Sequence, residues 1–342
     1  MALTPLTQRR LAQFKKNRRG FYSLIIFAFI FLVTTCAEFI ANDKPLLVYF
    51  DGHLYSPVLK NYPETHWGGV FETETNYRDP VVKDLISAKG WYLFPLIPYS
   101  FDTVNYDLTV PAPAPPSSDN WLGTDDQGRD LLARLIYGTR ISIWFGLILT
   151  FFAMVIGITV GGLQGYFGGK IDLYVQRFIE IWSGLPILYL LMILSSMVQP
   201  NFWWLLGIML LFGWMNLVAV VRAEFFRTRS LDYVRAAEAL GVSNISIMHR
   251  HILPNAMVAT ITYLPFIINA SITTLTSLDF LGFGLPPGSP SLGELITQGK
   301  NNVNATWLVM AGFTSLALIL SLLVFIGEAI RDAFDARKVV AS

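Results

Sequence analysis

The histidines and the single cysteine are the residues of this sequence that could do metal or nucleophilic chemistry. The four histidines are His53, His66, His249 and His251, and the cysteine is Cys36. His249 and His251 are two positions apart, so in a helix they point to different faces and do not predict a metal site. A single cysteine excludes an intrachain disulfide, and no Ser-His-Asp arrangement can be assembled. We therefore predict neither a metal site nor an enzyme.

A polar run at residues 120–130, Asn-Trp-Leu-Gly-Thr-Asp-Asp-Gln-Gly-Arg-Asp, gathers carboxylates beside an arginine. Asp125 and Asp126 are adjacent, and Arg129 and Asp130 open the next helix. The spacing is not that of an EF-hand calcium loop. We interpret the group as turn capping and ion pairing at a membrane surface.

A second polar stretch, residues 230–254, lies between two long apolar segments. Its composition predicts one short helix that is capped by Ser230 and ends at Gly241, where glycine permits a left-handed backbone. Another short helix is predicted from Ser243 to the residue before Pro254. Positions spaced i, i+4 and i+7 are expected on one face of the first helix: Tyr233, Ala237 and Leu240. Such a helix pair can lie in a groove of a partner protein.

This stretch resembles the coupling loop of importers of the ATP-binding-cassette type. That loop reads EAA, three residues, Gly, nine residues and Ile-x-Leu-Pro. This chain has Arg235-Ala236-Ala237, Gly241 and His251-Ile252-Leu253-Pro254 at the same spacing, so Arg235 and His251 depart from the pattern. The resemblance implies that ATPase subunits dock on this loop, at Asp232, Tyr233, Arg235, Ala236, Ala237, Leu240, Gly241, Leu253 and Pro254.

The run at 120–130 resembles the signature that precedes the second span in the C-type permeases of oligopeptide and dipeptide importers. The matching residues are Gly123, Thr124, Asp125, Gly128, Arg129 and Asp130. A Phe-Leu-Gly run at 280–282 is similar to the segment before the last span of these permeases. The resemblance implies a permease subunit that moves peptides across the bacterial inner membrane, with its pattern closest to permeases for microcin C and oligopeptides.

The resemblance also implies a fold and partners. The fold is all-α and polytopic, with the six transmembrane helices of a type I importer and an external insert between the first two. The implied partners are a second permease subunit, cytoplasmic ATP-binding subunits as one fused chain or two, a periplasmic peptide-binding protein and membrane lipid. Nucleic acid is not expected, because no basic and aromatic patch occurs in a soluble segment. No cofactor is expected, because ATP is bound by the partner subunits.

Composition independently places the chain in a membrane. Hydrophobic residues make up 53% and charged residues 14%, with a mean hydropathy of +0.49, which excludes a soluble globular protein. Six basic residues and no acid precede the apolar run 21–37, so the N-terminus is expected in the cytoplasm. Six spans with both termini inside place 16 of the 25 basic residues on that side.

The predicted organisation follows from these signals. Its parts are a basic N-terminus at 1–19, a first span at 20–41, an external insert with the segment leading into the next span at 42–137, a five-helix core at 138–335 and a cytoplasmic tail at 329–342. The core spans are expected at about 140–164, 178–198, 202–222, 255–278 and 305–328, with the coupling loop at 227–254. The insert holds 13 acidic and 7 basic residues and ends in a proline-rich segment expected to act as a linker.

Small and polar residues inside the spans carry further predictions. Four glycines recur every fourth position and predict close helix packing: Gly157, Gly161, Gly165 and Gly169. Gly169-Lys170 lacks the surrounding residues of a phosphate loop. Three polar residues are expected to face the bundle interior, where they either line a pathway or join helices: Ser183, Asn216 and Asn269.

Two other classes of function stay open. A secondary transporter would need ionisable or cation-coordinating residues within the spans, and the charge-free spans argue against it. A membrane-anchored receptor or enzyme would have residues 42–119 as its working part, which would then fold and bind alone.

Overall fold

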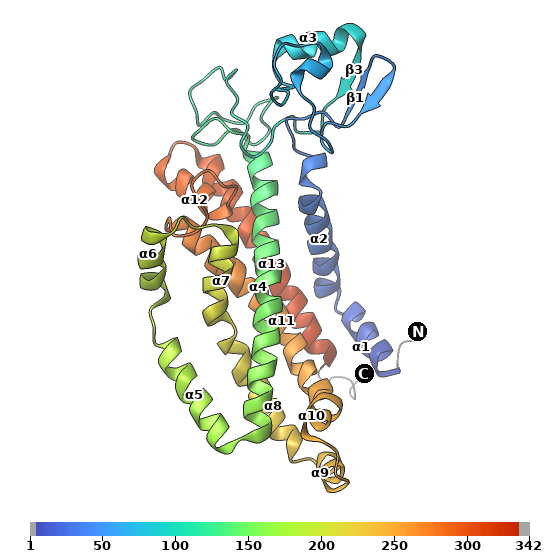
Figure 1. Cartoon of the computed structure of the whole chain (residues 1–342), viewed down its shortest axis with the longest axis vertical. Helices are drawn as coiled ribbons and strands as arrows, with labels where there is room; N and C mark the ends of the chain where they lie inside the picture. Colours follow the sequence, from blue (N-terminus) through green and yellow to red (C-terminus); the bar gives the residue numbers. More distant parts are fainter. Residues whose placement is uncertain (1–4, 335–342) are drawn as a thin grey trace.

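The computed structural model describes residues 5–334 of the chain. Long helices run side by side, with a small domain at one end of the bundle and short helices at the other (Figure 1). Within the described residues, five helical segments are long and apolar enough to cross a membrane: Arg18–Thr35, Leu131–Phe167, Phe202–Arg229, Asn244–Phe280 and Thr306–Phe334. A bent pair of shorter helices passes the same test only together, and brings the number to six if the pair is counted as one span. The predicted all-α polytopic fold is confirmed.

The helices of the bundle are α1 (Pro5–Lys16), α2 (Arg18–Thr35), α4 (Leu131–Phe167), α5 (Gly169–Ser183), α6 (Ile187–Met197), α7 (Phe202–Gly213), α8 (Met215–Arg229), α11 (Leu253–Phe280), α12 (Leu292–Asn301) and α13 (Thr306–Phe334). Helices α1 and α13 both reach the end of the bundle opposite the small domain (Figure 1).

The span expected at 178–198 differs in shape from a straight helix. Its helical structure begins earlier, at Gly169, and breaks between α5 and α6 with a bend of 64°. Pro186, whose backbone is extended, precedes α6. Proline lacks the N–H that an uninterrupted helix needs, so the helix breaks here. The bend places α5 and α6 at the edge of the bundle (Figure 1).

The insert contains a small folded unit, as expected of a partly folded external domain, but its fold was not predicted from the sequence. Strands β1 (Leu47–Phe50), β2 (His53–Tyr55) and β3 (Gly90–Leu93) form an antiparallel sheet of order β2-β1-β3, in which Tyr49 lies opposite Leu54 and Trp91. Helix α3 (Pro80–Lys89) and a 3-10 turn (Glu64–Trp67) complete it, whereas another 3-10 turn (Ala37–Phe39) follows α2 and packs against α4. One sheet face and α3 share a buried cluster: Val48, Phe50, Trp67, Tyr77, Val82 and Ile86.

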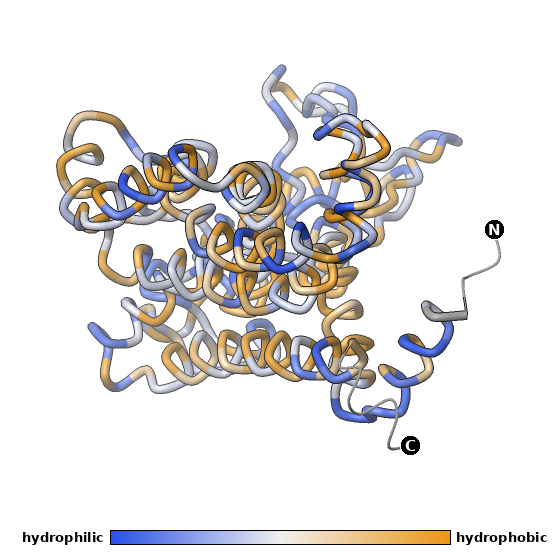
Figure 2. Tube along the Cα trace, turned by 90° about the horizontal axis from the view of Figure 1, so that it is seen from below, coloured by the Kyte–Doolittle hydropathy of each residue, from blue (hydrophilic) through white to orange (hydrophobic). Residues whose placement is uncertain are grey.

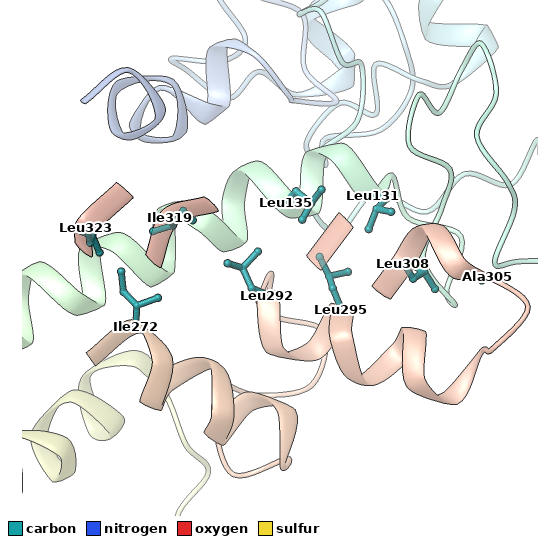
Figure 3. Packing of buried hydrophobic residues seen from close by; sticks show 9 residues of the cluster. All are labelled: Leu131, Leu135, Ile272, Leu292, Leu295, Ala305, Leu308, Ile319 and Leu323. Carbon is teal, nitrogen blue, oxygen red and sulfur yellow. The ribbon is translucent and has the colours of Figure 1, made fainter. Parts of the chain in front are cut away.

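A buried apolar cluster joins four helices beneath the insert. Figure 3 shows Leu131 and Leu135 of α4 facing α12 and α13, with Ile272 of α11 nearby. The other members come from α12, from α13 and from the residue before it: Leu292, Leu295, Ala305, Leu308, Ile319 and Leu323. The short α12 is thereby fixed against the longer spans.

Candidate functional site

The first short helix of the coupling loop, α9 (Asp232–Ala239), lies at the end of the bundle opposite the insert (Figure 1). Its start differs from the prediction, because α8 extends to Arg229 and the Ser230 hydroxyl donates to the Arg227 carbonyl. Leu231, with an extended backbone, therefore precedes α9 in place of Ser230. The helix ends as predicted at Gly241, whose φ is +77°. That conformation favours glycine.

The second short helix, α10 (Asn244–Ile247), does not stop before Pro254. It continues through a wider helical turn at Met248–Ile252 into α11. Pro254 directly follows this wider turn as the second residue of α11, so the continuous helix lacks one backbone N–H donor at that point. Leu253 begins α11. The two coupling helices, α9 and α10, are therefore inserted between the spans α8 and α11 without a flexible linker on the α11 side.

The coupling helices bury one face against the bundle. Val234 and Ala237 of α9 pack in a cluster with side chains of α8, α10 and α11: Leu217, Val221, Phe225, Ile247, Ile252 and Ala256. The expectation that Tyr233, Ala237 and Leu240 share one face of the helix is wrong. Ala237 is 7% exposed and Leu240 84% exposed, because Leu240 is the C-cap residue and lies beyond the last regular turn.

Hydrogen bonds connect the coupling helices to α11 and α4, and a further bond joins α8 to α4. The Asn255 side chain of α11 donates to the Tyr233 hydroxyl at 2.7 Å, and that hydroxyl donates to the His251 carbonyl at 3.2 Å. The Tyr166 hydroxyl, at the end of α4, donates to the Asn244 side chain at 2.9 Å. Arg229 of α8 donates to the Tyr166 carbonyl at 2.9 Å. A displacement of α9 and α10 would therefore reach α4, α8 and α11 together.

The outward surface of the coupling helices combines charged and apolar groups. Asp232, Arg235 and Ala236 are exposed. Leu240 and Ile245 expose 84% and 72% of their surface. These two apolar side chains lie on the loop to which the resemblance assigns the docking of ATPase subunits. Sequence reasoning missed Ile245, although its position two residues before the buried Ile247 indicates the opposite face of the short helix.

At the insert end, the signature residues Asp125 and Arg129 join Arg134 and the partly buried Glu294 in a charged cluster, defined here as these four residues. The Arg129 side chain donates to the Asp125 carboxylate, with Nε–Oδ2 and Nη2–Oδ2 distances of 2.7 and 2.6 Å. Arg134 Nε lies 3.2 Å from the same carboxylate, and Glu294 of α12 lies 3.4 Å from Arg134 Nη2. The ion-pairing interpretation of the signature is consistent with this geometry.

Arg134 and Glu294 were not among the predicted site residues. Glu294 is 160 positions from Arg134, and neither residue shows a local spacing signal. Arg134 also donates to the backbone carbonyls of Phe101, Gly288 and Ser289 at 3.0, 3.2 and 2.9 Å. The Arg134 side chain therefore joins the start of α4 to the insert, to the loop that follows α11, and to α12.

The other signature residues shape the turn before α4. Asp130 caps the helix by accepting from the Ala133 N–H at 2.8 Å and also accepts from Asn120 at 2.8 Å. Thr124 pairs with Ala114 through two hydrogen bonds, of 2.8 and 2.9 Å, so the proline-rich segment is bonded to the signature and is not a free linker. Gly123 and Gly128 have φ of +83° and +79°, conformations that favour glycine.

Burial dominates the electrostatics of two carboxyls in this region. It raises the pKa of the Asp130 carboxyl, although the hydrogen bond from Ala133 opposes the shift. Burial also raises the pKa of the Glu294 carboxyl, and the nearby Arg134 and Arg129 lower it by less. Desolvation of the charge outweighs the hydrogen bonds at Asp130 and the nearby guanidinium groups at Glu294.

Three of the four predicted packing glycines lie where α4 crosses α8. Positions 157, 161 and 165 leave no room for a side chain. A Cβ at Gly165 would lie 2.5 Å from Phe225 Cβ and 2.6 Å from the Arg222 carbonyl oxygen. Gly169 is not part of this face, because α4 ends at Phe167 and Gly169 begins α5 with a φ of +54°.

In the part of the chain that the structure describes, no hydrogen bond joins the three predicted pathway residues to one another. Asn269 donates to the Leu320 carbonyl at 2.9 Å, so it joins α11 to α13. The Ser183 hydroxyl donates to the Glu180 carbonyl at 3.1 Å within its own helix and is exposed. Asn216, at the start of α8, is also exposed. Within residues 5–334, no group of three or more metal-ligating side chains is arranged to hold an ion.

Comparison with known proteins finds relatives among the membrane components of transport systems. The family model described as binding-protein-dependent transport system inner membrane component matches residues 135–340. The inner membrane ABC transporter permease protein YejE of Escherichia coli K12 is 60% identical over 99% of both chains. The peptidoglycan transport system permease protein YejE of Agrobacterium fabrum is 53% identical over 98% of this chain and 94% of its own.

A more distant relative matches a smaller part of the chain. The oligopeptide transport system permease protein OppC of Lactococcus lactis is 33% identical over 66% of this chain and 78% of its own. The family model covers more than half of this chain, including α8 to α13 with the coupling helices. The chain therefore belongs to the family of inner membrane components of binding-protein-dependent transport systems.

Proposed function

We propose that this chain is a permease subunit that imports peptides across the bacterial inner membrane. In this proposal a second permease subunit completes the translocation pathway, and a periplasmic peptide-binding protein delivers the substrate at the insert end. Both termini and the coupling helices lie in the cytoplasm, as the basic residues of α1 favour. The chain itself binds no cofactor, and ATP is bound and hydrolysed by the partner subunits.

The observation that carries the proposal is the exposed pair Leu240 and Ile245 on helices that hydrogen bonds join to α4 and α11. An ATP-binding subunit that accepts these side chains in a groove would move α9 and α10 as it closes and opens. The hydrogen bonds through Tyr166 and Tyr233 would transmit that displacement to α4, α8 and α11. A shift of packed helices of this kind converts a local movement into a change of access.

Relatives support peptides as the substrate class. The Escherichia coli and Lactococcus lactis relatives are named as an ABC transporter permease and an oligopeptide permease. A second candidate, fragments of peptidoglycan, is favoured by the name of the Agrobacterium fabrum relative. Both substrates contain short peptides, and uptake assays with a plain peptide and with a glycan-linked peptide distinguish them.

The test is uptake of a labelled peptide by cells in which Leu240→Asp replaces the native chain. A buried interface tolerates a new charge poorly, so we expect a loss of uptake of roughly tenfold or more at normal membrane levels. Leu59→Asp is the matched control, since Leu59 is 73% exposed in the insert. Normal uptake by the Leu240 variant would refute the proposed energy coupling.

A further inference from the structure

The N-terminal helix α1 is a basic element held at the edge of the bundle. Residues 1–37 contain no acid, and five basic residues of α1 and the start of α2 are exposed: Arg9, Lys15, Lys16, Arg18 and Arg19. Within the described residues, none of the five takes part in an ion pair. The mechanism proposed above uses none of these charges.

Contacts with α13 hold α1 in place. Phe14 is buried against Ala329 and Ala333 of α13. The Arg10 guanidinium lies 4.4 Å from the centre of the Phe334 ring. Arg9 and Lys16, seven positions apart, lie on the face opposite Phe14. The helix is therefore ordered before any ligand binds, with its free cations directed away from the bundle.

The level of α1 in the membrane follows from its distance to the first span. Only Asn17 separates α1 from α2, and the Asn17 side chain caps α2 by accepting from the Gly20 N–H at 3.3 Å. Gly20 is in direct contact with Ala329, which fixes this corner on α13. Since α2 is a candidate span, α1 must lie where the apolar region ends. Seen from below, α1 lies beside the bundle and not beneath it (Figure 2).

We propose that α1 is a binding site for anionic phospholipid headgroups of the inner leaflet. The position rests on the cytoplasmic orientation given under the proposed function. Phosphate groups of lipids such as phosphatidylglycerol supply the negative charge that the five exposed cations lack within the described residues. Clusters of basic residues directly beside a span recruit anionic lipid in this way. The exposed Tyr22 is suited to the same interfacial level.

The positions of these charges favour lipid headgroups over a soluble protein as the ligand. Lys15, Lys16, Arg18 and Arg19 follow one another within five positions around the corner at Asn17, so their charges concentrate at the membrane boundary. Long Lys and Arg side chains can reach headgroups while their stems contact the apolar region. Leu11, which is 45% exposed, adds an apolar contact beside them.

The test places a fluorophore on α1 of the full chain and measures its quenching by lipid. The reporter is Ala12→Cys with the native cysteine changed to Ser (C36S), in nanodiscs that contain headgroup-labelled phosphatidylglycerol or headgroup-labelled phosphatidylcholine as quencher. We expect stronger quenching by phosphatidylglycerol, and loss of the difference at high salt. In R9Q/K15Q/K16Q the preference should fall severalfold, since each basic residue contributes roughly a fivefold gain in association with anionic lipid.

The control is K170Q/R177Q, which removes two exposed cations of α5 and should leave the preference unchanged. Equal quenching by the two lipids, or an unchanged preference in the triple variant, overturns the proposal. Salt-sensitive loss of an ATP-binding subunit from the triple variant, with no lipid preference in the native chain, would assign α1 to a protein partner and also overturn it. The quenching does not depend on transport, so its failure is distinct from a failure of the proposed function.

Discussion

At the scale of single residues, the Arg134 guanidinium holds several segments together at the insert end. It is fully buried, bonded to carbonyls of the insert and of the loop after α11, and paired with Asp125 and Glu294. Removal of one partner of a buried ion pair leaves the other charge without compensation. The cluster is thus expected to hold the loop and α12 in position.

A pair of arginines on α4 tests this expectation. Arg134→Gln should lower the free energy of unfolding by about 3–5 kcal/mol, the usual effect of breaking a buried pair. Arg140→Gln should change it by about 0–1 kcal/mol, because Arg140 pairs with Glu38 at 2.6 Å in a partly exposed position. The measurement is the thermal unfolding of the purified variants in detergent. Equal stability of the two variants would show that the charged cluster does not hold this end together.

At the scale of elements, α4 and α8 pack closely because glycines lie where the two helices cross. The backbones approach so nearly at Gly157, Gly161 and Gly165 that any side chain would overlap α8. Small residues at such crossings favour close helix packing in lipid. Because α8 leads into α9, the crossing also joins the coupling helices to the span that begins at the insert.

Alanine substitutions at two glycines test whether α4 and α8 need this close approach. Gly165→Ala should destabilise the chain by about 1–3 kcal/mol, because the added Cβ requires α4 and α8 to separate. Gly207→Ala is the matched control. Its Cβ would meet no atom within 4 Å, so the change should be neutral or stabilise α7 by about 0.5–1 kcal/mol. Comparable thermal stability of both variants would contradict the crossing as described.

At the scale of the whole molecule, the signals that are local in sequence were the predictable ones. Apolar runs long enough to span a membrane indicated the helical fold class, and Gly241 indicated the end of α9 through its backbone freedom. The contacts between distant segments were not predictable, as with Arg134 and Glu294. The inward orientation of Ala237 also depends on how α9 packs against α8. Strands of three or four residues gave too short an alternation to indicate the sheet of the insert.

In the proposed function, the end with the coupling helices receives the movement of the ATP-binding subunits, and the insert end receives the substrate. This central claim is tested most directly by crosslinking from cysteine at position 240, in the Leu240→Cys variant with C36S, in membranes that contain the native partner subunits. We expect a crosslink to an ATP-binding subunit that changes with bound nucleotide, and little or none from Ala237→Cys, whose position is buried. Transport-competent membranes in which position 240 crosslinks to no ATP-binding subunit would contradict the account.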